Sequence, residues 1–320
     1  MDVARLEDRA RALRAIRAFF DARGFTEVET PVRIPAPAPE PHIDCPPSGD
    51  WFLRASPELQ MKKLLAAGMA RIYQIGPCFR AGEKGRRHNP EFTMLEWYRA
   101  HADYTQIAAD AEELLSSVLW TRGSASPTTP FKRLTVREAY LRWAGWDPVE
   151  AWDQDRFDFD MATKIEPNLP KGPLFLMDYP APAASRARLK ADDPRVAERW
   201  ELYVDGLELA NAFTELTDPV EQRRRFECAR AERRALGEAD YPLDEEFLDA
   251  LARMPPSGGV ALGVDRLVML ACGVHDIAEV IAFATWRLGG SEIERNASKT
   301  PLLPNSSSPS GESKLCVGCG

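Results

Sequence analysis

Two predicted β-hairpins constrain the fold of this chain more than any other feature. Residues 71–79 and 91–98 have strand-like patterns and flank a charged, glycine-containing loop. Residues 200–204 and 207–212 flank Asp205-Gly206, a dipeptide typical of two-residue hairpin turns. Hairpins join antiparallel strands, and helix-like segments lie before, between and after them. The sequence therefore predicts an α+β fold around a mainly antiparallel sheet flanked by helices.

Helix signals surround these hairpins. Apolar residues at helical spacing predict helices near 6–20 and 105–119, and a charged helix is predicted at 221–236. Another helix is predicted to open at Ser56-Pro57-Glu58, with Ser56 as the cap, Pro57 at the first helical position and Glu58 facing the positive end of the dipole. Near the C-terminal end we expect a turn at Gly258-Gly259, followed by an apolar helix over 262–272.

Composition excludes several classes of protein. The chain has 320 residues, 44% apolar and 28% charged, with a net charge of -8, which argues against a protein that coats nucleic acid. It has no run of about 18 apolar residues and no secretory signal, so we expect a cytoplasmic protein without a membrane span. Neither a P-loop nor a dinucleotide-binding glycine motif is present. We divide the chain into a catalytic domain over 1–287 and a Ser/Pro/Gly-rich tail over 288–320, predicted to be disordered.

Three segments carry a resemblance to a known family. They are GFTEVETP at 24–31, FR at 79–80 with NPEFTMLE at 89–96, and GVALGVDRL at 259–267. In this order they resemble motifs 1, 2 and 3 of the class II aminoacyl-tRNA synthetases. The lysine-specific branch is the most similar, and HNPEFTMLEWY and LELANAFTELTD strengthen the match. The similarity runs from about Leu6 to Ala284.

The length of the chain narrows this resemblance. A lysyl-tRNA synthetase carries an N-terminal β-barrel that reads the anticodon, whereas motif 1 here begins within the first thirty residues. We therefore expect no anticodon-binding barrel. A stand-alone core of this kind resembles the bacterial elongation factor P–lysine lysyltransferases. That family activates lysine, preferentially (R)-β-lysine, with ATP and transfers it to a lysine of elongation factor P. The resemblance also implies a homodimer and makes tRNA charging unexpected.

Two other functions stay open from the sequence. A truncated tRNA-charging enzyme is one alternative, and a catalytically inactive paralogue that regulates a partner is another. Clustered basic residues offer a docking surface for an acidic protein, either Arg186, Arg188 and Lys190 or Arg223–Arg225. Solvated loop and helix charges are the ordinary explanation of both groups.

The chemistry of adenylation explains the residues at the nucleotide end. A carboxylate must attack the α-phosphorus of ATP, so the site needs fixed positive charge. Arg80 is the candidate clamp for both anions, because a guanidinium suits two oxyanions. Phe92 and Arg266 are expected to sandwich the adenine. The resemblance makes Arg80 and Arg266 catalytic and assigns ATP contacts to Arg80, His88, Asn89, Phe92, Glu208, Leu209, Gly263 and Arg266.

Two acids beside the Asp205-Gly206 turn suggest a metal site. In a two-residue hairpin residue 203 pairs with 208, so Glu201 and Glu208 lie diagonally on one face. Two carboxylates on one face suit Mg²⁺ that also binds phosphate oxygens. The resemblance assigns this role to them, and two solvated strand acids are the alternative.

The resemblance also predicts a pocket for a lysine-like substrate. Glu96, Tyr98 and Glu215 match the residues that hold the side-chain ammonium, and Glu58 matches the one that holds the amine nearer the reacting carboxylate. Strict alternation puts Glu208 and Glu215 on opposite faces of their strand, so the strand must bend or bulge between them. The full predicted pocket is Ser56, Pro57, Glu58, Glu96, Tyr98, Asn211, Phe213, Glu215 and Ala261.

Overall fold

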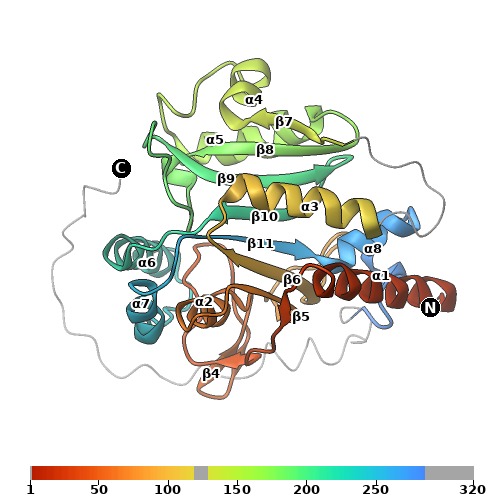
Figure 1. Ribbon diagram of the computed structural model, residues 1–320. Helices are drawn as coiled ribbons and strands as arrows, with labels where there is room; N and C mark the ends of the chain where they lie inside the picture. Colours follow the sequence, from red (N-terminus) through yellow and green to blue (C-terminus); the bar gives the residue numbers. More distant parts are fainter. Residues whose placement is uncertain (1, 119–128, 285–320) are drawn as a thin grey trace.

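The computed structural model describes residues 2–118 and 129–284 (Figure 1). The tail predicted at 288–320 lies outside these residues. The helices are α1 Val3–Asp21, α2 Glu58–Ala66, α3 Tyr104–Val118, α4 Val136–Trp143, α5 Gln154–Asp160, α6 Pro219–Ala235, α7 Glu245–Leu251 and α8 Val264–Cys272. The strands are β1 Thr26–Glu27, β2 Arg33–Ile34, β3 Pro47–Ser48, β4 Trp51–Leu53, β5 Arg71–Phe79, β6 Glu91–Ala100, β7 Lys132–Thr135, β8 Pro173–Pro180, β9 Val196–Val204, β10 Leu207–Thr214 and β11 Ser257–Gly263.

An eight-stranded sheet runs through the molecule in the order β1-β5-β6-β11-β10-β9-β8-β7. The pairs from β5 to β8 are antiparallel, and the two edge strands β1 and β7 pair in parallel with their neighbours. A separate three-stranded sheet joins β2, β4 and β3. The predicted α+β class with a mainly antiparallel sheet is confirmed. Within the described ranges these two sheets contain every named strand, and none of the described helices is long and apolar enough to cross a membrane.

Both predicted hairpins are confirmed. Strands β5 and β6 pair from Phe79 opposite Glu91 to Arg71 opposite Arg99. Strands β9 and β10 begin their pairing at Val204 opposite Leu207. The two turn residues between them have positive φ, 51° and 76°, which Asp and Gly tolerate at low cost. Local turn chemistry therefore determines the central part of the sheet.

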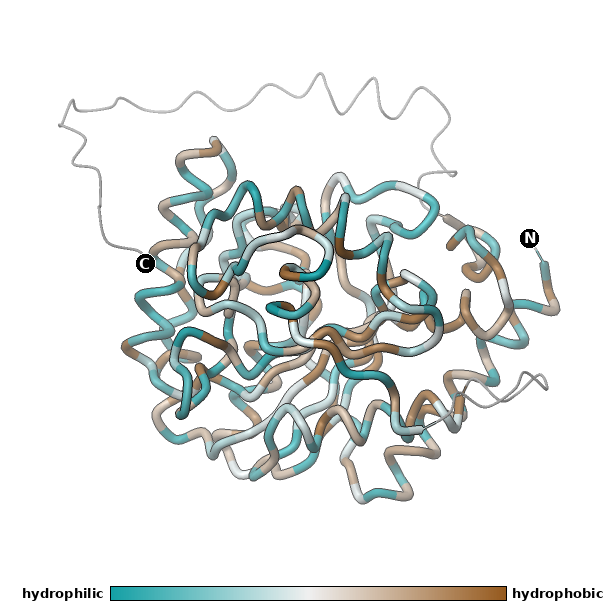
Figure 2. The backbone as a smooth tube through the Cα atoms, turned by 90° about the horizontal axis from the view of Figure 1, so that it is seen from above, coloured by the Kyte–Doolittle hydropathy of each residue, from teal (hydrophilic) through white to brown (hydrophobic). Residues whose placement is uncertain are grey.

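One face of the sheet carries the main hydrophobic core. Alternate residues of β6, Leu95 and Trp97, are fully buried against α1, α3 and α8. Val260 and Leu262 of β11 point to the same core. Figure 1 shows α1 and α3 lying across the strands, and in the view from above in Figure 2 hydrophobic stretches cross the middle of the molecule. Burial of this face leaves the intervening side chains on the other face.

Helix α2 packs near the other face, together with α6 and α7. It begins at Glu58 and not at Pro57, which occupies the Ncap position with φ -81° and ψ 1°. The predicted cap Ser56 still contributes, because its hydroxyl accepts a hydrogen bond from the Glu58 amide at 3.0 Å. The helix start is therefore displaced by one residue from the prediction.

The predicted turn at Gly258-Gly259 is wrong. Both glycines lie inside the central strand β11, and the helix α8 begins only at Val264. A Cβ on Gly258 would lie 2.5 Å from the Ile107 side chain, and one on Gly259 would lie 2.4 Å from the Tyr98 ring. Glycine is present here because neighbouring elements approach the strand closely. From the sequence alone, a glycine pair of this kind cannot be distinguished from a turn.

Candidate active site

A cavity of about 370 Å³ opens on the sheet face opposite α1, α3 and α8. Its volume lies in the range of small-molecule sites. Alternation along β6 sends Glu96 and Tyr98 into the cavity while Trp97 enters the core. All the predicted site residues except Pro57 line it: Ser56, Glu58, Arg80, His88, Asn89, Phe92, Glu96, Tyr98, Glu201, Glu208, Leu209, Asn211, Phe213, Glu215, Ala261, Gly263 and Arg266.

A β-bulge in β10 brings two predicted subsites onto one face. Glu208 pairs with Tyr203, but Ala210 pairs with Leu202, so Leu209 is an extra residue in the ladder. Beyond the bulge Asn211 and Phe213 face the cavity, and Glu215 follows in the same phase. The irregularity that the sequence required between Glu208 and Glu215 is therefore present.

Arg80 stands at the end of β5, at the nucleotide end predicted from the motifs. Its guanidinium lies 5.1 Å from the centre of the Phe92 ring and 3.6 Å from Glu83. The Arg80 Nε atom is buried and has no hydrogen-bond partner within residues 2–118 and 129–284. A partly exposed guanidinium with a buried, unused donor suits an anionic ligand.

Arg266 joins α8 to two other parts of the site. It donates to the Glu208 carbonyl at 2.7 Å and contacts His88 Nε2 at 2.8 Å. Burial and the charge of Arg266 both lower the pKa of His88. Asn89, next to His88, is buried and donates to the Glu91 carbonyl. Arg266 of motif 3 thus contacts the end of the loop that connects β5 to β6.

The carboxylates of Glu201 and Glu208 converge as the hairpin geometry predicts. Glu201 accepts hydrogen bonds from Arg199 at 2.7 Å and from the Tyr203 hydroxyl at 2.8 Å. Burial and the charge of Glu201 raise the pKa of Glu208. Two neighbouring acids in an arginine-lined cavity, one of which raises the pKa of the other, fit a divalent cation that also binds phosphate. No group of three His, Cys, Asp or Glu with metal-site geometry occurs in the described part of the chain.

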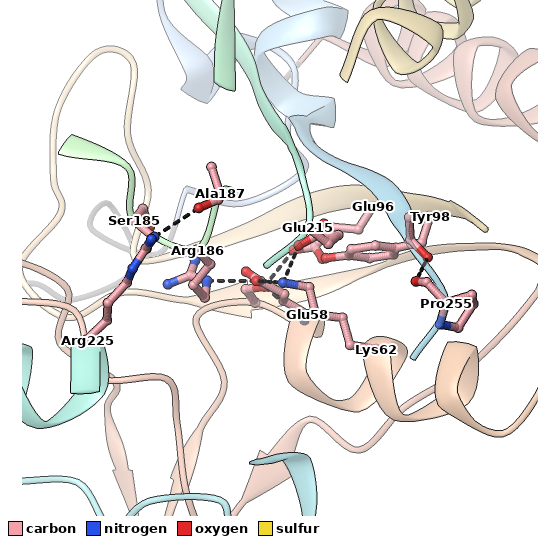
Figure 3. Close-up of polar contacts among 12 residues, drawn as sticks. Glu58, Lys62, Glu96, Tyr98, Ser185, Arg186, Ala187, Glu215, Arg225 and Pro255 are labelled. Atoms are coloured by element: carbon pink, nitrogen blue, oxygen red, sulfur yellow. Dashed lines mark hydrogen bonds and ion pairs between the residues drawn. The ribbon is translucent and has the colours of Figure 1, made fainter. Parts of the chain in front are cut away.

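Glu96 lines the cavity beside Tyr98 (Figure 3) and accepts hydrogen bonds from neutral donors. Ser56 donates to its Oε1 at 2.6 Å and Tyr98 to its Oε2 at 2.7 Å. Burial and the nearby Glu58 charge raise the pKa of Glu96 to about 7. A buried carboxylate held only by hydroxyl groups suits an incoming cation, which would restore its charge.

Glu58 and Glu215 have internal cationic partners, which the sequence did not reveal. Lys62, one turn along α2, lies 2.5 Å from Glu58 and also pairs with Glu215. Arg186 donates to Glu58 at 2.7 Å (Figure 3). Burial alone would raise the pKa of Glu58, but Arg186 and Lys62 outweigh it and hold that pKa at about 2. Burial raises the pKa of Glu215 to about 8, although Lys62 opposes the change.

Four basic residues of the site were missed: Lys62, Arg87, Arg186 and Arg199. Lys62 is four residues from Glu58, a helical spacing that could have suggested their pairing. Arg186 was predicted as a candidate for a docking surface, whereas it is buried and lines the cavity. Of the other candidates for that surface, Arg223, Arg224 and Arg225 all pair with Glu245 or Glu221 inside the chain.

Comparison with known proteins decides the family. The family model described as tRNA synthetases class II (D, K and N) matches residues 3–287. The chain belongs to the class II tRNA synthetases. The resemblance inferred from its three motifs is therefore confirmed.

Relatives of this class II synthetase fall into two groups by length. An elongation factor P–(R)-β-lysine ligase of Proteus mirabilis is 41% identical over 322 residues, covering 89% of this chain and 96% of the relative. The ligase of the same name from Photorhabdus laumondii is 40% identical, covering 88% and 95%. A lysine–tRNA ligase of Moorella thermoacetica is 39% identical, but the match covers 87% of this chain and only 64% of that longer protein.

Proposed function

We propose that this chain is an ATP-dependent ligase that activates lysine, preferentially (R)-β-lysine, and transfers it to a lysine side chain of elongation factor P. The observation that carries the proposal is the cavity itself. It contains Arg80, whose Nε donor has no partner in the described residues, and Glu96, a buried carboxylate that contacts no cationic side chain. Relatives named for this activity match over nearly their full length. The cytoplasmic location and the homodimer stay predictions of the sequence.

The residues divide the reaction between the two ends of the cavity. Arg80 would neutralise the substrate carboxylate and the α-phosphate as the carboxylate oxygen attacks phosphorus and pyrophosphate leaves. Phe92 and Arg266 would hold the adenine by stacking. Glu96, Tyr98 and Glu215 would hold the terminal ammonium. In the second step the free acceptor amine attacks the adenylate carbonyl, loses a proton and releases AMP.

Glu201 and Glu208 would hold Mg²⁺, which neutralises phosphate charge when it is bound. Glu208→Gln removes one anionic ligand. We expect it to raise the Mg²⁺ concentration for half-maximal pyrophosphate exchange by about tenfold or more. Glu198→Gln is the control, because Glu198 lies on the neighbouring strand β9, which carries Glu201, but pairs with Arg188 outside the cavity. An equal effect of both substitutions would contradict the metal role.

The decisive experiment measures the intact mass of elongation factor P after incubation with this protein, ATP, Mg²⁺ and (R)-β-lysine. We expect a gain of one lysyl residue, and its loss with Arg80→Ala. An acceptor already shown to be modified by a known ligase of this type is the control. No gain on that acceptor would overturn the proposal. Acylation of tRNA in a parallel assay would instead support the truncated synthetase, and absence of any adenylate would support an inactive paralogue.

A further inference from the structure

Three side chains join the N-terminal helix to the two segments expected to hold the adenine, and we call them the Arg9 triangle. Arg9 of α1 donates through Nη1 to Asp265 Oδ1 at 2.5 Å and through Nη2 to the Thr93 hydroxyl at 2.7 Å. Asp265 Oδ2 accepts from the Thr93 amide at 2.8 Å, which closes the triangle. Asp265 directly precedes Arg266 in the chain, and Thr93 directly follows Phe92. Both of the expected stacking residues are therefore next to a member of the triangle.

The sheet ends just before this place. The pairing of β11 with β6 runs as far as Gly263 opposite Met94, and the next residue of the chain, Val264, begins α8. Beyond this pair the Thr93 amide donates to the Asp265 carboxylate. The end of β6 and the start of α8 are thus held together by a side chain, so their separation depends on what fixes that carboxylate.

Arg9 is the group that fixes the carboxylate. The Asp265 side chain is 4% exposed and that of Arg9 is 17% exposed. A carboxylate so deeply buried requires donors for its oxygens, and Arg9 supplies one of the two seen here. A guanidinium carries its donors on separate nitrogens in one rigid plane. Arg9 therefore sets the position of the carboxylate and of the Thr93 hydroxyl relative to each other.

A second contact between α1 and this end of the cavity supports the same arrangement. Arg5, one turn before Arg9, pairs with Glu279. The short helix that contains Glu279 also contains Ile277, which lines the cavity and donates its amide to the Arg86 carbonyl at 2.8 Å. The N-terminal half of α1 is thus fastened to the predicted nucleotide end at two points. Of these two, the Arg9 pair is the one next to the expected stacking residues.

We propose that Arg9 is a positioning residue that sets the spacing of the adenine site from outside the cavity. Through the Arg9 triangle it holds the backbone beside Phe92 and beside Arg266 at a separation that admits an aromatic base. Arg9 is not among the residues that line the cavity, so it acts through the stacking residues and not by contact with the nucleotide. This inference rests on the proposed function for the identity of the ligand.

Calorimetric titration of the full chain with ATP and Mg²⁺, without amino acid, tests the inference. We expect Arg9→Met to raise the dissociation constant for ATP by about tenfold, because stacking on the base is weakened. The dissociation constant for (R)-β-lysine, measured without ATP, should stay within about twofold of wild type. Arg17→Met is the matched control, because Arg17 lies on the same helix and joins it to Glu27 by an exposed ion pair. It should leave both constants unchanged.

A double-mutant cycle separates positioning from a general loss of structure. Phe92→Leu removes the aromatic ring, so Arg9→Met should weaken ATP binding by only about threefold in that background. A full tenfold effect there would overturn the inference, and so would equal weakening of ATP and (R)-β-lysine by Arg9→Met alone. Thr93→Val removes only the hydroxyl of the triangle and should raise the dissociation constant for ATP by about threefold. This variant keeps the test decisive if Arg9→Met does not fold.

The outcomes distinguish the inference from the proposed function. A selective loss of ATP affinity in Arg9→Met supports the inference even if no lysyl residue is transferred to elongation factor P. Unchanged ATP affinity in both Arg9→Met and Thr93→Val overturns the inference, while a mass gain of elongation factor P with the wild-type chain would still support the proposed function. Absence of ATP binding by the wild-type chain would overturn both.

Discussion

Arg266 and His88 are joined across the nucleotide end of the cavity, with Nη2 and Nε2 2.8 Å apart. A guanidinium only donates hydrogen bonds, so His88 Nε2 must accept, and the imidazole is neutral with its proton on Nδ1. The lowered pKa of His88 agrees with this assignment. The contact links motif 3 to the loop of motif 2, the two segments that the resemblance assigns to ATP.

The first prediction concerns the pKa of His88. By NMR titration we expect it below 6.5, the ordinary value for imidazole. Arg266→Met should raise it toward that value, because the adjacent positive charge is removed. Arg234→Met, on the exposed side of α6, is the control and should leave it unchanged. A His88 resonance that titrates above 6.5 in the wild-type chain would contradict the neutral assignment.

The second prediction concerns pH and ligand binding through Glu96. Its pKa of about 7 means that the carboxyl is neutral in acid and charged above neutrality. A cationic ligand requires the charged form, so we expect the affinity for 6-aminohexanoic acid, which keeps the terminal ammonium and lacks the second amine, to rise as pH increases through about 7. Binding at low pH should release a proton, which calorimetry in buffers of different ionisation enthalpy measures.

Tyr98→Phe sharpens this test. It removes the hydroxyl that stabilises the charged form of Glu96, so the midpoint should move upward by about one pH unit. Tyr203→Phe removes the equivalent hydroxyl from Glu201 at the other end of the cavity and should leave the midpoint in place. Identical midpoints in all three proteins would exclude Glu96 as the titrating group.

Two glycines of β11 give the third prediction. A Cβ on Gly259 would lie 2.1 Å from Glu215 Oε1 as well as against Tyr98, whereas a Cβ on Gly263 meets nothing closer than Arg266 Cδ at 3.6 Å. We expect Gly259→Ala to lower the free energy of unfolding by about 1–3 kcal/mol in urea denaturation and to weaken amino-acid binding. Gly263→Ala should leave the unfolding free energy within about 0.5 kcal/mol of wild type.

Gly263→Ala also tests nucleotide contact. If ATP approaches this backbone as the resemblance implies, the variant should raise the KM for ATP in pyrophosphate exchange while stability stays unchanged. An unchanged KM would remove Gly263 from the nucleotide site.

The fourth prediction concerns Arg233, a fully buried residue of α6. It donates to the carbonyls of Glu40 and Ile43 and to Asp44, and so fastens the loop that forms a wall of the cavity. We expect Arg233→Met to lower the free energy of unfolding by about 3 kcal/mol and to weaken amino-acid binding.

Arg234→Met is the matched control for Arg233. Arg234 is half-exposed and pairs with Asp240 at 3.1 Å, so its loss should change stability by less than about 0.5 kcal/mol. Equal destabilisation by the two substitutions would show that the buried contacts of Arg233 contribute no more than a surface pair.

Local chemistry explains why much of the fold could be predicted. The Asp205-Gly206 turn determines the register of β9 and β10, and that register predicts that Glu201 and Glu208 share a face. The bulge near Leu209 followed from the resemblance, which places Glu208 and Glu215 in one site although strict alternation puts them on opposite faces. The inferences about the hairpin use residues close together in the chain.

Contacts between distant segments could not be predicted in this way. Arg186 and Glu58 are 128 residues apart, and nothing in the composition around Arg186 distinguishes a buried partner from a surface charge. The Gly258-Gly259 pair was interpreted as a turn. Tyr98 and Glu215, which leave no room for a side chain at Gly259, are distant from it in the sequence, so the sequence did not show why glycine is needed there. A single sequence contains no pattern that reveals ion pairs or steric contacts between segments so far apart.

The bulge at Leu209 also has a consequence for how this site can evolve. Before it, β10 presents Glu208 to the predicted phosphate-binding end of the cavity; after it, the same strand presents Asn211 and Phe213 to the predicted amino-acid end. The extra residue determines which side chains after Leu209 face the cavity. The orientation of Asn211 and Phe213 is therefore set separately from that of Glu208. A point substitution after the bulge therefore leaves the position of Glu208 unchanged, whereas deletion of one residue at the bulge would turn either Glu208 or Asn211 and Phe213 away from the cavity.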